Sequence, residues 1–240
     1  MPDPDISIIV TGHREGLLAG PSAASARAAR RQAEASGLRV ETIVVLDRTD
    51  RLTADTLRAA LTEDARFIET DTGDPGQARN AGIGTAVGLC SAFLDGDDLW
   101  SSNWLSSAWD LNRERPDAIL HPHVLMSFGD RRHIYLHVDS ESPGFDPGYL
   151  SWMNYWDAMS FARTEIYRRY PFKANDLQLG FGHEDWHWSA LTLAAGIPHK
   201  PVPGTMHFKR ARGGSQMSRV DGVRGIRWPI EPGYRGAVPR

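Results

Sequence analysis

Residues 91–100 read Ser-Ala-Phe-Leu-Asp-Gly-Asp-Asp-Leu-Trp, and this short segment carries most of the information about the architecture. Its first four residues are mostly apolar and predict a buried strand that leads into the acidic residues. Because residues i and i+2 of an extended chain face the same side, Asp95 and Asp97 can converge on one ligand, and Gly96 lets the backbone approach it closely. Paired carboxylates favour a bound cation such as Mg²⁺ or Mn²⁺. A solvated, Asp-rich turn is an equally good interpretation of these residues alone.

Strands alternate with helices in the part of the chain before this segment. The predicted elements are a strand at residues 6–10, a helix at 22–36, a strand at 40–46, a helix at 53–63, a strand at 66–69 and a helix at 77–88. This order is typical of βαβ units in a mostly parallel sheet. Ligands of such sheets bind beyond the carboxyl ends of the strands, where Asp47 and Asp95 both fall.

The pattern after Trp100 is less regular. The predicted elements there are a helix at residues 104–113, strands at 118–122 and 133–138, a loop at 139–154, a helix at 184–195 and a strand at 200–208 that Pro201 and Pro203 interrupt. No internal repeat and no linker divides the chain, so the sequence predicts one domain.

The composition excludes several classes of protein. The chain has 240 residues, the length of one large α/β domain, and its formal charge of −3 gives no overall electrostatic case for binding nucleic acid. The single cysteine, Cys90, excludes an internal disulfide and a cysteine-based zinc site. No apolar run approaches the roughly 18 residues of a transmembrane helix, and the first residues lack the pattern of a signal peptide. We therefore expect a soluble cytoplasmic protein, either free or at the inner face of the membrane.

Residues 75–82 (PGQARNAG) and 92–100 (AFLDGDDLW) together resemble the nucleotide-sugar half of the family 2 glycosyltransferases, which have the GT-A fold. The likeness is dense over the first hundred residues and returns in patches as far as Arg219. It implies a Rossmann-like, mostly parallel central sheet flanked by helices, with a small extension on the acceptor side. The expected organisation is a single GT-A domain over 1–240, made of a nucleotide-sugar half (1–100), an acceptor half (101–220) and a tail (221–240).

The resemblance also assigns residues to the donor. By position, Asp95 matches the acid that meets the ribose, Asp97 the acid that meets the metal, and Asp47 the acid that reads the base. The full set expected to bind the nucleotide-sugar is Thr11, Glu15, Asp47, Arg79, Asp95, Gly96, Asp97 and Arg210. The family often shows two acids followed by Gly-Ser where this chain has Leu46-Asp47-Arg48-Thr49, so the base is left open, with a UDP-sugar as the expected donor.

A second constellation lies at residues 180–188 (GFGHEDWHW), where Glu184 and Asp185 begin a predicted helix. Acids at a helix start interact well with the helix dipole and need no function, which is the alternative interpretation. The segment resembles the family's ED motif, and this implies that Asp185 is the general base. Glu184, Trp186 and Trp156 are then expected at the acceptor, although an aromatic residue at the position of Trp156 is more often part of the core.

A third constellation is residues 207–215 (HFKRARGGS), which alone would indicate a basic surface loop. The resemblance implies that His207 joins Asp97 as a metal ligand and that Arg210 or Arg212 neutralises the leaving diphosphate. His121 and His123 form a weaker candidate for a metal pair, because Pro122 between them predicts a loop.

Together these features predict a metal-dependent, inverting glycosyltransferase that uses Mn²⁺ or Mg²⁺. It would move a sugar from a nucleoside diphosphate sugar to a hydroxyl of a glycan, lipid-linked or other acceptor, in glycan or cell-surface polysaccharide synthesis. One alternative is a Mg²⁺-dependent phosphohydrolase or nucleotidyltransferase built on the same acids, although no P-loop is present. The other is a non-catalytic nucleotide- or glycan-binding module of the same fold. The sequence does not indicate an oligomeric state.

Overall fold

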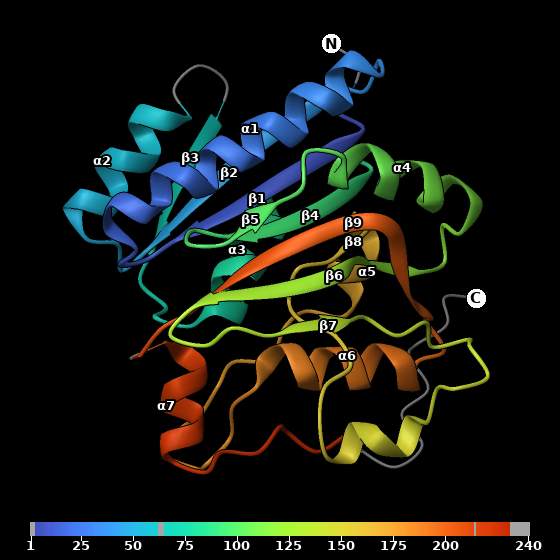
Figure 1. Ribbon diagram of the computed structural model, residues 1–240. Helices are drawn as coiled ribbons and strands as arrows, with labels where there is room; N and C mark the ends of the chain where they lie inside the picture. Colours follow the sequence, from blue (N-terminus) through green and yellow to red (C-terminus); the bar gives the residue numbers. More distant parts are fainter. Residues whose placement is uncertain (1–2, 62–64, 214, 231–240) are drawn as a thin grey trace.

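The computed structural model describes residues 3–61, 65–213 and 215–230 (Figure 1). The strands are β1 (Ile6–Gly12), β2 (Val40–Asp47), β3 (Ala65–Thr70), β4 (Cys90–Asp95), β5 (Leu99–Trp100), β6 (Ile119–Gly129), β7 (Ile134–Leu136), β8 (Phe161–Arg163) and β9 (His199–Ala211). The α-helices are α1 (Ala19–Ala35), α2 (Arg51–Ala60), α3 (Pro75–Thr85), α4 (Trp104–Glu114), α5 (Thr164–Arg169), α6 (Glu184–Ala194) and α7 (Gln216–Gly222). Two 3₁₀ turns, η1 (Gly16–Leu18) and η2 (Pro147–Ser151), complete the set.

One sheet organises the described part of the chain. Its strand order is β3-β2-β1-β4-β8-β6-β9-β5, and β7 pairs with β6. The strands β3, β2, β1 and β4 are mutually parallel, and so are β6 and β9, whereas β8 is antiparallel to both of its neighbours. The predicted α/β class with a mostly parallel sheet in the first half is therefore confirmed.

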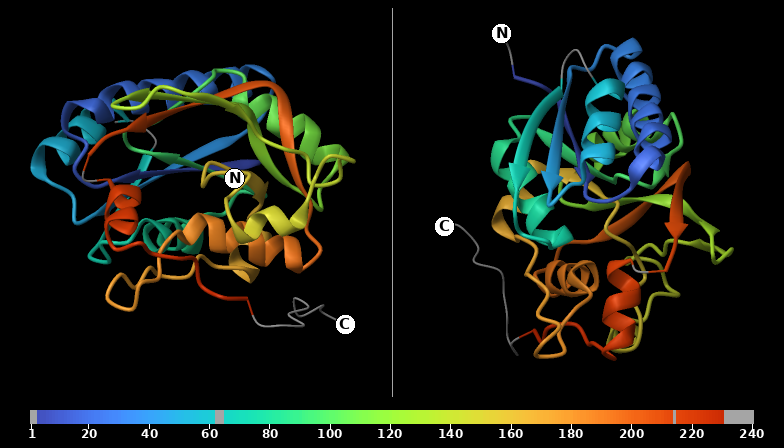
Figure 2. Two further views of the ribbon diagram at one scale, coloured as in Figure 1. Left: turned by 60° about the horizontal axis from the view of Figure 1, so that its bottom comes forward. Right: turned by 90° about the vertical axis from the view of Figure 1, so that its left-hand side faces the viewer.

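The direction of the crossovers fixes where a ligand can bind. The connections from β1 to β2 and from β2 to β3 move one way along the sheet, and the connection from β3 to β4 moves back past β1. Right-handed crossovers then place α1 and α2 on one face and α3 on the other, as Figures 1 and 2 show. The strand order thus reverses between β1 and β4, and doubly wound sheets bind ligands at the carboxyl ends of the strands at such a point.

The predicted elements of the first half are present with small shifts at their ends. The helix expected from Ser22 begins at Ala19, because Ser22 does not cap it and its hydroxyl donates instead to the Asp95 carbonyl oxygen, at 3.1 Å. Asp50 caps α2 by accepting from the Thr53 amide at 2.8 Å. The end predicted for this helix, Glu63, lies outside the described residues.

The second half departs further from the prediction. Pro201 and Pro203 do not interrupt β9, which is one continuous strand, and β6 runs through Pro122, where a loop was expected. Proline removes a donor from the ladder, so it is tolerated where pairing is irregular. The register of β6 against β9 does shift between Pro122 and Val124.

The interior has a main core and a smaller second cluster. The main core surrounds β1, β2 and β4, whose apolar residues are buried because helices cover both faces of the sheet. The second cluster contains Leu150, Trp156 and Ala190 and lies between η2 and α6. Figure 1 shows α6, η2 and α7 together in a layer below β6 and β7. None of the helices that the structure describes is both long and apolar enough to traverse a lipid bilayer.

Candidate active site

Thr11 and Asp95 lie opposite each other at the carboxyl ends of β1 and β4, where the strand order reverses. The Thr11 hydroxyl donates to Asp95 Oδ1 at 3.1 Å. A Cβ atom on Gly96 would lie 2.6 Å from the Thr11 carbonyl oxygen. Glycine is therefore required here because the chain approaches itself, whereas the sequence suggested an approach to the ligand. Thr11, Asp95 and Gly96 are thus held together at the edge where a ligand is expected.

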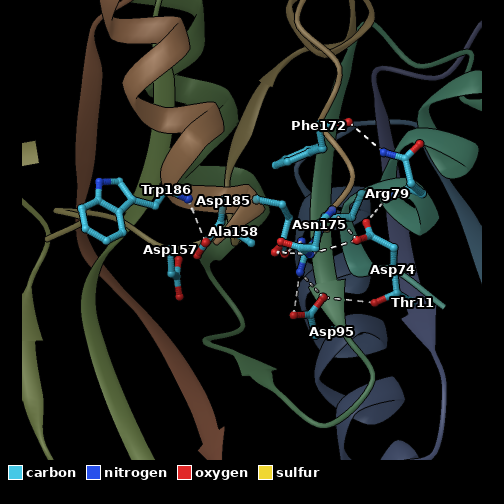
Figure 3. Close-up of polar contacts among 12 residues, drawn as sticks. Thr11, Asp74, Arg79, Asp95, Asp157, Ala158, Phe172, Asn175, Asp185 and Trp186 are labelled. Carbon is cyan, nitrogen blue, oxygen red and sulfur yellow. Dashed lines mark hydrogen bonds and ion pairs between the residues drawn. The ribbon is translucent and has the colours of Figure 1, made fainter. Parts of the chain in front are cut away.

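Arg79 is the central cation of this edge. Its Nη2 donates to both carboxylate oxygens of Asp95 at 2.8 Å, and its Nη1 donates to Glu184 Oε1 at 3.0 Å (Figure 3). The Arg79 side chain is only 2% exposed. Burial alone would lower the pKa of Arg79, but the charges of Asp95 and Glu184 outweigh burial and hold it above its usual value. The same contact keeps the pKa of Asp95 below its usual value, although burial opposes this.

Asn175 extends this network to the start of α3. Its side-chain amide donates to Glu184 Oε2 at 3.0 Å and to Asp74 Oδ2 at 2.9 Å. Asp74 caps α3 by accepting from the Gln77 amide at 2.9 Å. Both carboxylate oxygens of Glu184 are therefore occupied, and this residue joins α6 to the strand ends.

The pKa of Asp97 is shifted in the opposite direction to that of Asp95. Burial and the neighbouring carboxylates of Asp98 and Glu15 raise the pKa of Asp97 to about 7. Arg212 lies between two of these acids, with Nε 3.0 Å from Asp97 Oδ2 and Nη2 3.8 Å from Glu15 Oε1. Arg210 is more distant, since its Nη1 lies 3.6 Å from the same Asp97 oxygen. Asp97 and Glu15 thus form a carboxylate cluster that attracts cations.

His207 lies inside a second buried charge cluster. Its Nε2 is 2.9 Å from Asp98 Oδ2, and its Nδ1 is 2.6 Å from Asp157 Oδ2. The second contact lacks the alignment of a hydrogen bond, so it is a charge–charge contact. Burial would lower the pKa of His207, but the two carboxylates outweigh it and raise the pKa to about 9. The ring is therefore an imidazolium held between two acids.

Asp185 occupies the first turn of α6, after His183, whose backbone is left-handed (φ 57°). Its Oδ1 accepts from the Trp186 amide at 2.8 Å, and the Trp186 indole donates to the Leu150 carbonyl oxygen at 2.8 Å. These contacts fix the start of α6 against η2. In Figure 3, Asp157, Asp185 and Trp186 lie together on one side of the site, and Arg79 and Asp95 lie on the other.

Asp47 ends β2 and is buried. Its Oδ1 accepts from the Thr70 hydroxyl at 2.9 Å and from the Thr72 amide and hydroxyl at 2.7 and 2.9 Å. The next residue, Arg48, has a positive φ of 46° and pairs with Asp71 at 2.6 Å. Asp47 therefore fixes the loop after β3 at the same edge of the sheet as Asp95.

Comparison with known proteins identifies the family. The sequence matches the family model described as glycosyl transferase family 2 over residues 7–175. The chain belongs to this family. No curated protein matches the sequence.

The fold of this family 2 member is similar to that of solved glycosyltransferase structures. A crystal structure of S. aureus TarS 1-349 in complex with UDP-GlcNAc has a TM-score of 0.66 and 16% identity, over 89% of this chain and 60% of that one. TarS 1-349 in complex with UDP has a TM-score of 0.62 and 15% identity, over 91% and 64% of the two chains. This chain thus spans less than two thirds of either neighbour, and the likeness confirms the GT-A fold.

The family implies a divalent metal, and the residues present fit it in part. Asp97 fits, because burial and the neighbouring carboxylates raise its pKa, and a bound cation would stabilise its charged form. Mg²⁺ commonly takes one or two carboxylates and completes its shell with phosphate and water. His207 does not fit in this arrangement, because Asp98 and Asp157 already contact both of its ring nitrogens, at 2.9 and 2.6 Å. No cluster of three or more metal-ligating side chains occurs among the residues that the structure describes.

Three further residues have surroundings in the structure that differ from those expected from the sequence. Arg79 was expected at the base or the phosphates, but its guanidinium is enclosed by Asp95 and Glu184. Trp156 was expected at the acceptor, but it is 2% exposed and stacks on His199 at 4.1 Å between ring centroids. His121, the weaker metal candidate, is buried against His199 at 2.9 Å between ring nitrogens.

Two polar residues of the site were not found by sequence reasoning. Asp157 and Asn175 lie in irregular segments between strands and helices, and no local motif marks them. Their partners, His207 and Asp74, are 50 and 101 residues away along the chain. Only the three-dimensional fold brings these pairs together.

Proposed function

We propose that this chain transfers a sugar, with inversion, from a nucleoside diphosphate sugar to a hydroxyl group of an acceptor. The observation that supports this most strongly is the contact of Arg79 with both Asp95 and Glu184. It joins the donor edge of the sheet to the helix start that carries Asp185. A donor beyond β4 and an acceptor in front of α6 would then meet in one site.

Asp185 is the proposed general base. Its carboxylate is half-buried in the first turn of α6, where the helix dipole favours negative charge. As the acceptor oxygen forms its bond to the anomeric carbon, the hydroxyl proton passes to Asp185. The bond from the anomeric carbon to the diphosphate oxygen breaks, and the nucleoside diphosphate leaves with the electron pair.

The remaining donor residues have separate proposed tasks. Asp95 would accept from the ribose hydroxyls and Asp47 would read the base, since both lie at the carboxyl ends of parallel strands. Asp97, with Glu15 nearby, would hold Mn²⁺ or Mg²⁺. When bound, such an ion supplies stabilisation of the negative charge on the leaving diphosphate. Arg210 and Arg212 would move from Asp97 toward the phosphates.

The donor is proposed to be a UDP-sugar. The TarS structures of similar fold were solved with UDP-GlcNAc and with UDP, which supports the same nucleotide here. The proposed acceptor is a glycan or lipid-linked glycan, with a role in polysaccharide synthesis. Trp186, beside Asp185 and partly exposed, is the aromatic side chain best placed to contact a sugar ring of the acceptor.

A thermal-shift panel tests this proposal directly. UDP, GDP, dTDP and CMP are each added with Mn²⁺, Mg²⁺ or EDTA, to the wild-type protein and to Asp97→Asn. Ligand at about a hundred times its dissociation constant stabilises by roughly 2.7 kcal/mol, which such an assay resolves. We expect UDP to stabilise the wild type in the presence of metal and the variant much less. Absence of any nucleotide effect, or nucleotide hydrolysis without an acceptor, would contradict the proposed function.

A further inference from the structure

The β6–β7 hairpin has polar side chains on its inner side and apolar side chains on its outer side. Alternate residues of a strand face opposite sides of a sheet, so Ile134 and Leu136 share one side of β7. These two side chains are 62% and 56% exposed. On the other side, Tyr135 contacts the ring of His137, which lies 3.8 Å from Asp157 at the candidate site. An antiparallel edge strand usually has the reverse arrangement, with its apolar side chains turned toward the core.

The two neighbouring strands repeat this arrangement. Directly paired residues of adjacent strands lie on the same side of a sheet. The outer side therefore carries two apolar rows across β7, β6 and β9, namely Ile134–Met126–Phe208 and Leu136–Val124–Met206, which we call the outer face. The inner side carries Ser127 and His207, which are both buried. Among the described residues, neither core cluster includes the outer face or packs against it, so core packing does not account for its composition.

The hairpin projects from the body of the molecule. Figure 1 shows β6 and β7 at the front, with no helix of the described chain drawn across them, and the right-hand view of Figure 2 places the hairpin at the edge of the molecule. Exposed apolar side chains on an edge strand promote aggregation, and edge strands usually carry charges instead. An apolar surface that is kept exposed marks a contact with a partner or a membrane.

Two arginines at the turn of the hairpin indicate which contact this is. Arg131 and Arg132 are exposed, and no carboxylate of the described residues lies within ion-pair distance of either. The acid of the same turn, Asp130, is occupied, since its Oδ2 accepts from the Gly213 amide at 2.9 Å. Apolar side chains beside unpaired basic ones are typical of surfaces that bind anionic lipid. An acidic protein or a nucleic acid would match the arginines but not the aliphatic rows.

We propose that the outer face binds the surface of an anionic lipid bilayer. Ile134 and Leu136, its most exposed side chains, enter the apolar part of the interface, and the two arginines of the turn contact the headgroup phosphates. Because β8 is antiparallel to both β4 and β6, the turn after β6 lies at the edge of the sheet that carries Asp95. The bilayer would thus hold the candidate site beside the headgroups, where a lipid-linked acceptor presents its sugars. Bilayer binding itself requires neither donor nor acceptor, so this inference is independent of the proposed function.

Co-sedimentation with lipid vesicles tests the proposal. Vesicles of phosphatidylcholine, alone or mixed with phosphatidylglycerol, are titrated without nucleotide against the wild type, Ile134→Thr/Leu136→Thr and Arg131→Gln/Arg132→Gln. Threonine keeps the β propensity of the strand, so the first variant should fold. We expect the wild type to bind the mixed vesicles and the threonine variant to bind them at least about tenfold more weakly. The glutamine variant should lose about twentyfold on mixed vesicles, because each arginine near an anionic surface contributes about fivefold.

A matched pair of exposed apolar residues lies at the opposite end of the sheet. Val87 and Leu89 are 53% and 50% exposed and come just before β4. Val87→Thr/Leu89→Thr should leave vesicle binding unchanged. Circular dichroism and the melting temperature show whether each variant is folded.

Three results would overturn the proposal. One is a wild type that binds no vesicles, and another is a threonine variant that binds them as strongly as the wild type, because the contact would then lie on another surface. The third is a wild-type dimer, detected by light scattering, that the threonine variant dissociates while neither protein binds lipid, which would assign the outer face to a second copy of the chain. None of these results affects the nucleotide titrations that test the proposed function, since those contain no lipid.

Discussion

Two regions of the molecule each bring two carboxylates together in the interior, and each neutralises them with a different cation. At the ends of the parallel strands, Arg79 is buried between Asp95 and Glu184, with contacts of 2.8 and 3.0 Å. Beside β9, His207 is buried between Asp98 and Asp157, with contacts of 2.9 and 2.6 Å. Each region therefore consists of one cation between two carboxylates, and each joins segments far apart in the sequence.

The difference between them is the chemistry of the cation. A guanidinium stays charged at every accessible pH and reaches two acids with its fork of N–H groups. An imidazole is charged only while protonated, so the cluster at His207 depends on pH and the cluster at Arg79 does not. Asp185 follows Glu184, the partner of Arg79, and Figure 3 shows it near Asp157, the partner of His207, so the proposed base lies between the two regions.

Removal of the base should have the largest effect on activity and little effect on either cluster. Asp185→Asn should lower kcat by about 10²- to 10⁴-fold, the usual contribution of a general base. Donor affinity and the free energy of unfolding should stay close to those of the wild type, because Asp185 pairs with neither Arg79 nor His207. Steady-state transfer assays, UDP titration and urea unfolding measure the three quantities. A variant that keeps most of its transfer rate would refute the assignment of Asp185.

Loss of Arg79 should have the next largest effect, this time on stability. Arg79→Met leaves Asp95 and Glu184 without their buried partner, and removal of one member of such a cluster commonly costs about 3–5 kcal/mol. Urea unfolding measures this loss. Arg51→Met is the matched control, because Arg51 is 94% exposed and pairs only with Asp55 on the surface of α2. The control should change stability by less than about 0.5 kcal/mol. A similarly small change for Arg79→Met would show that the cluster contributes nothing.

The first of these regions was more accessible to sequence reasoning than the second. Apolar runs such as residues 40–46 show their strands plainly, because a strand buried on both faces needs no polar positions. Asp95 was placed at the edge of the sheet because it directly follows such a run. Helix ends were harder: α1 starts before Ser22 because η1 leads straight into it and Ser22 bonds to a strand instead.

The pairing within each region could not be predicted. Arg79 and Glu184 are 105 residues apart, and no local pattern indicates that they meet. The partners of His207 come from the turn after β4 and from the loop before β8, and the latter has no motif. The resemblance to the family suggested His207 as a metal ligand because a motif compares only the type of residue at each position. Whether a buried imidazole carries a proton depends instead on the acids that the fold brings to it.

The smallest expected effect is the pH dependence that distinguishes the two regions. The pKa of His207 is raised to about 9 in the folded protein, above its unfolded value. The folded state therefore binds the extra proton, and this stabilisation is complete below about pH 6.5 and is lost as the pH rises through 9. The upper limit of the loss is about 3 kcal/mol, and Arg79 contributes nothing to it because its charge does not change in that range. Urea unfolding at intervals between pH 8 and 9.5, above the pKa of about 7 of Asp97, measures the slope, and NMR of the histidine rings assigns it. A His207 resonance that titrates near pH 6.5, like that of an exposed histidine, would contradict this prediction and would show that the ring is neutral above that pH and available as a metal ligand.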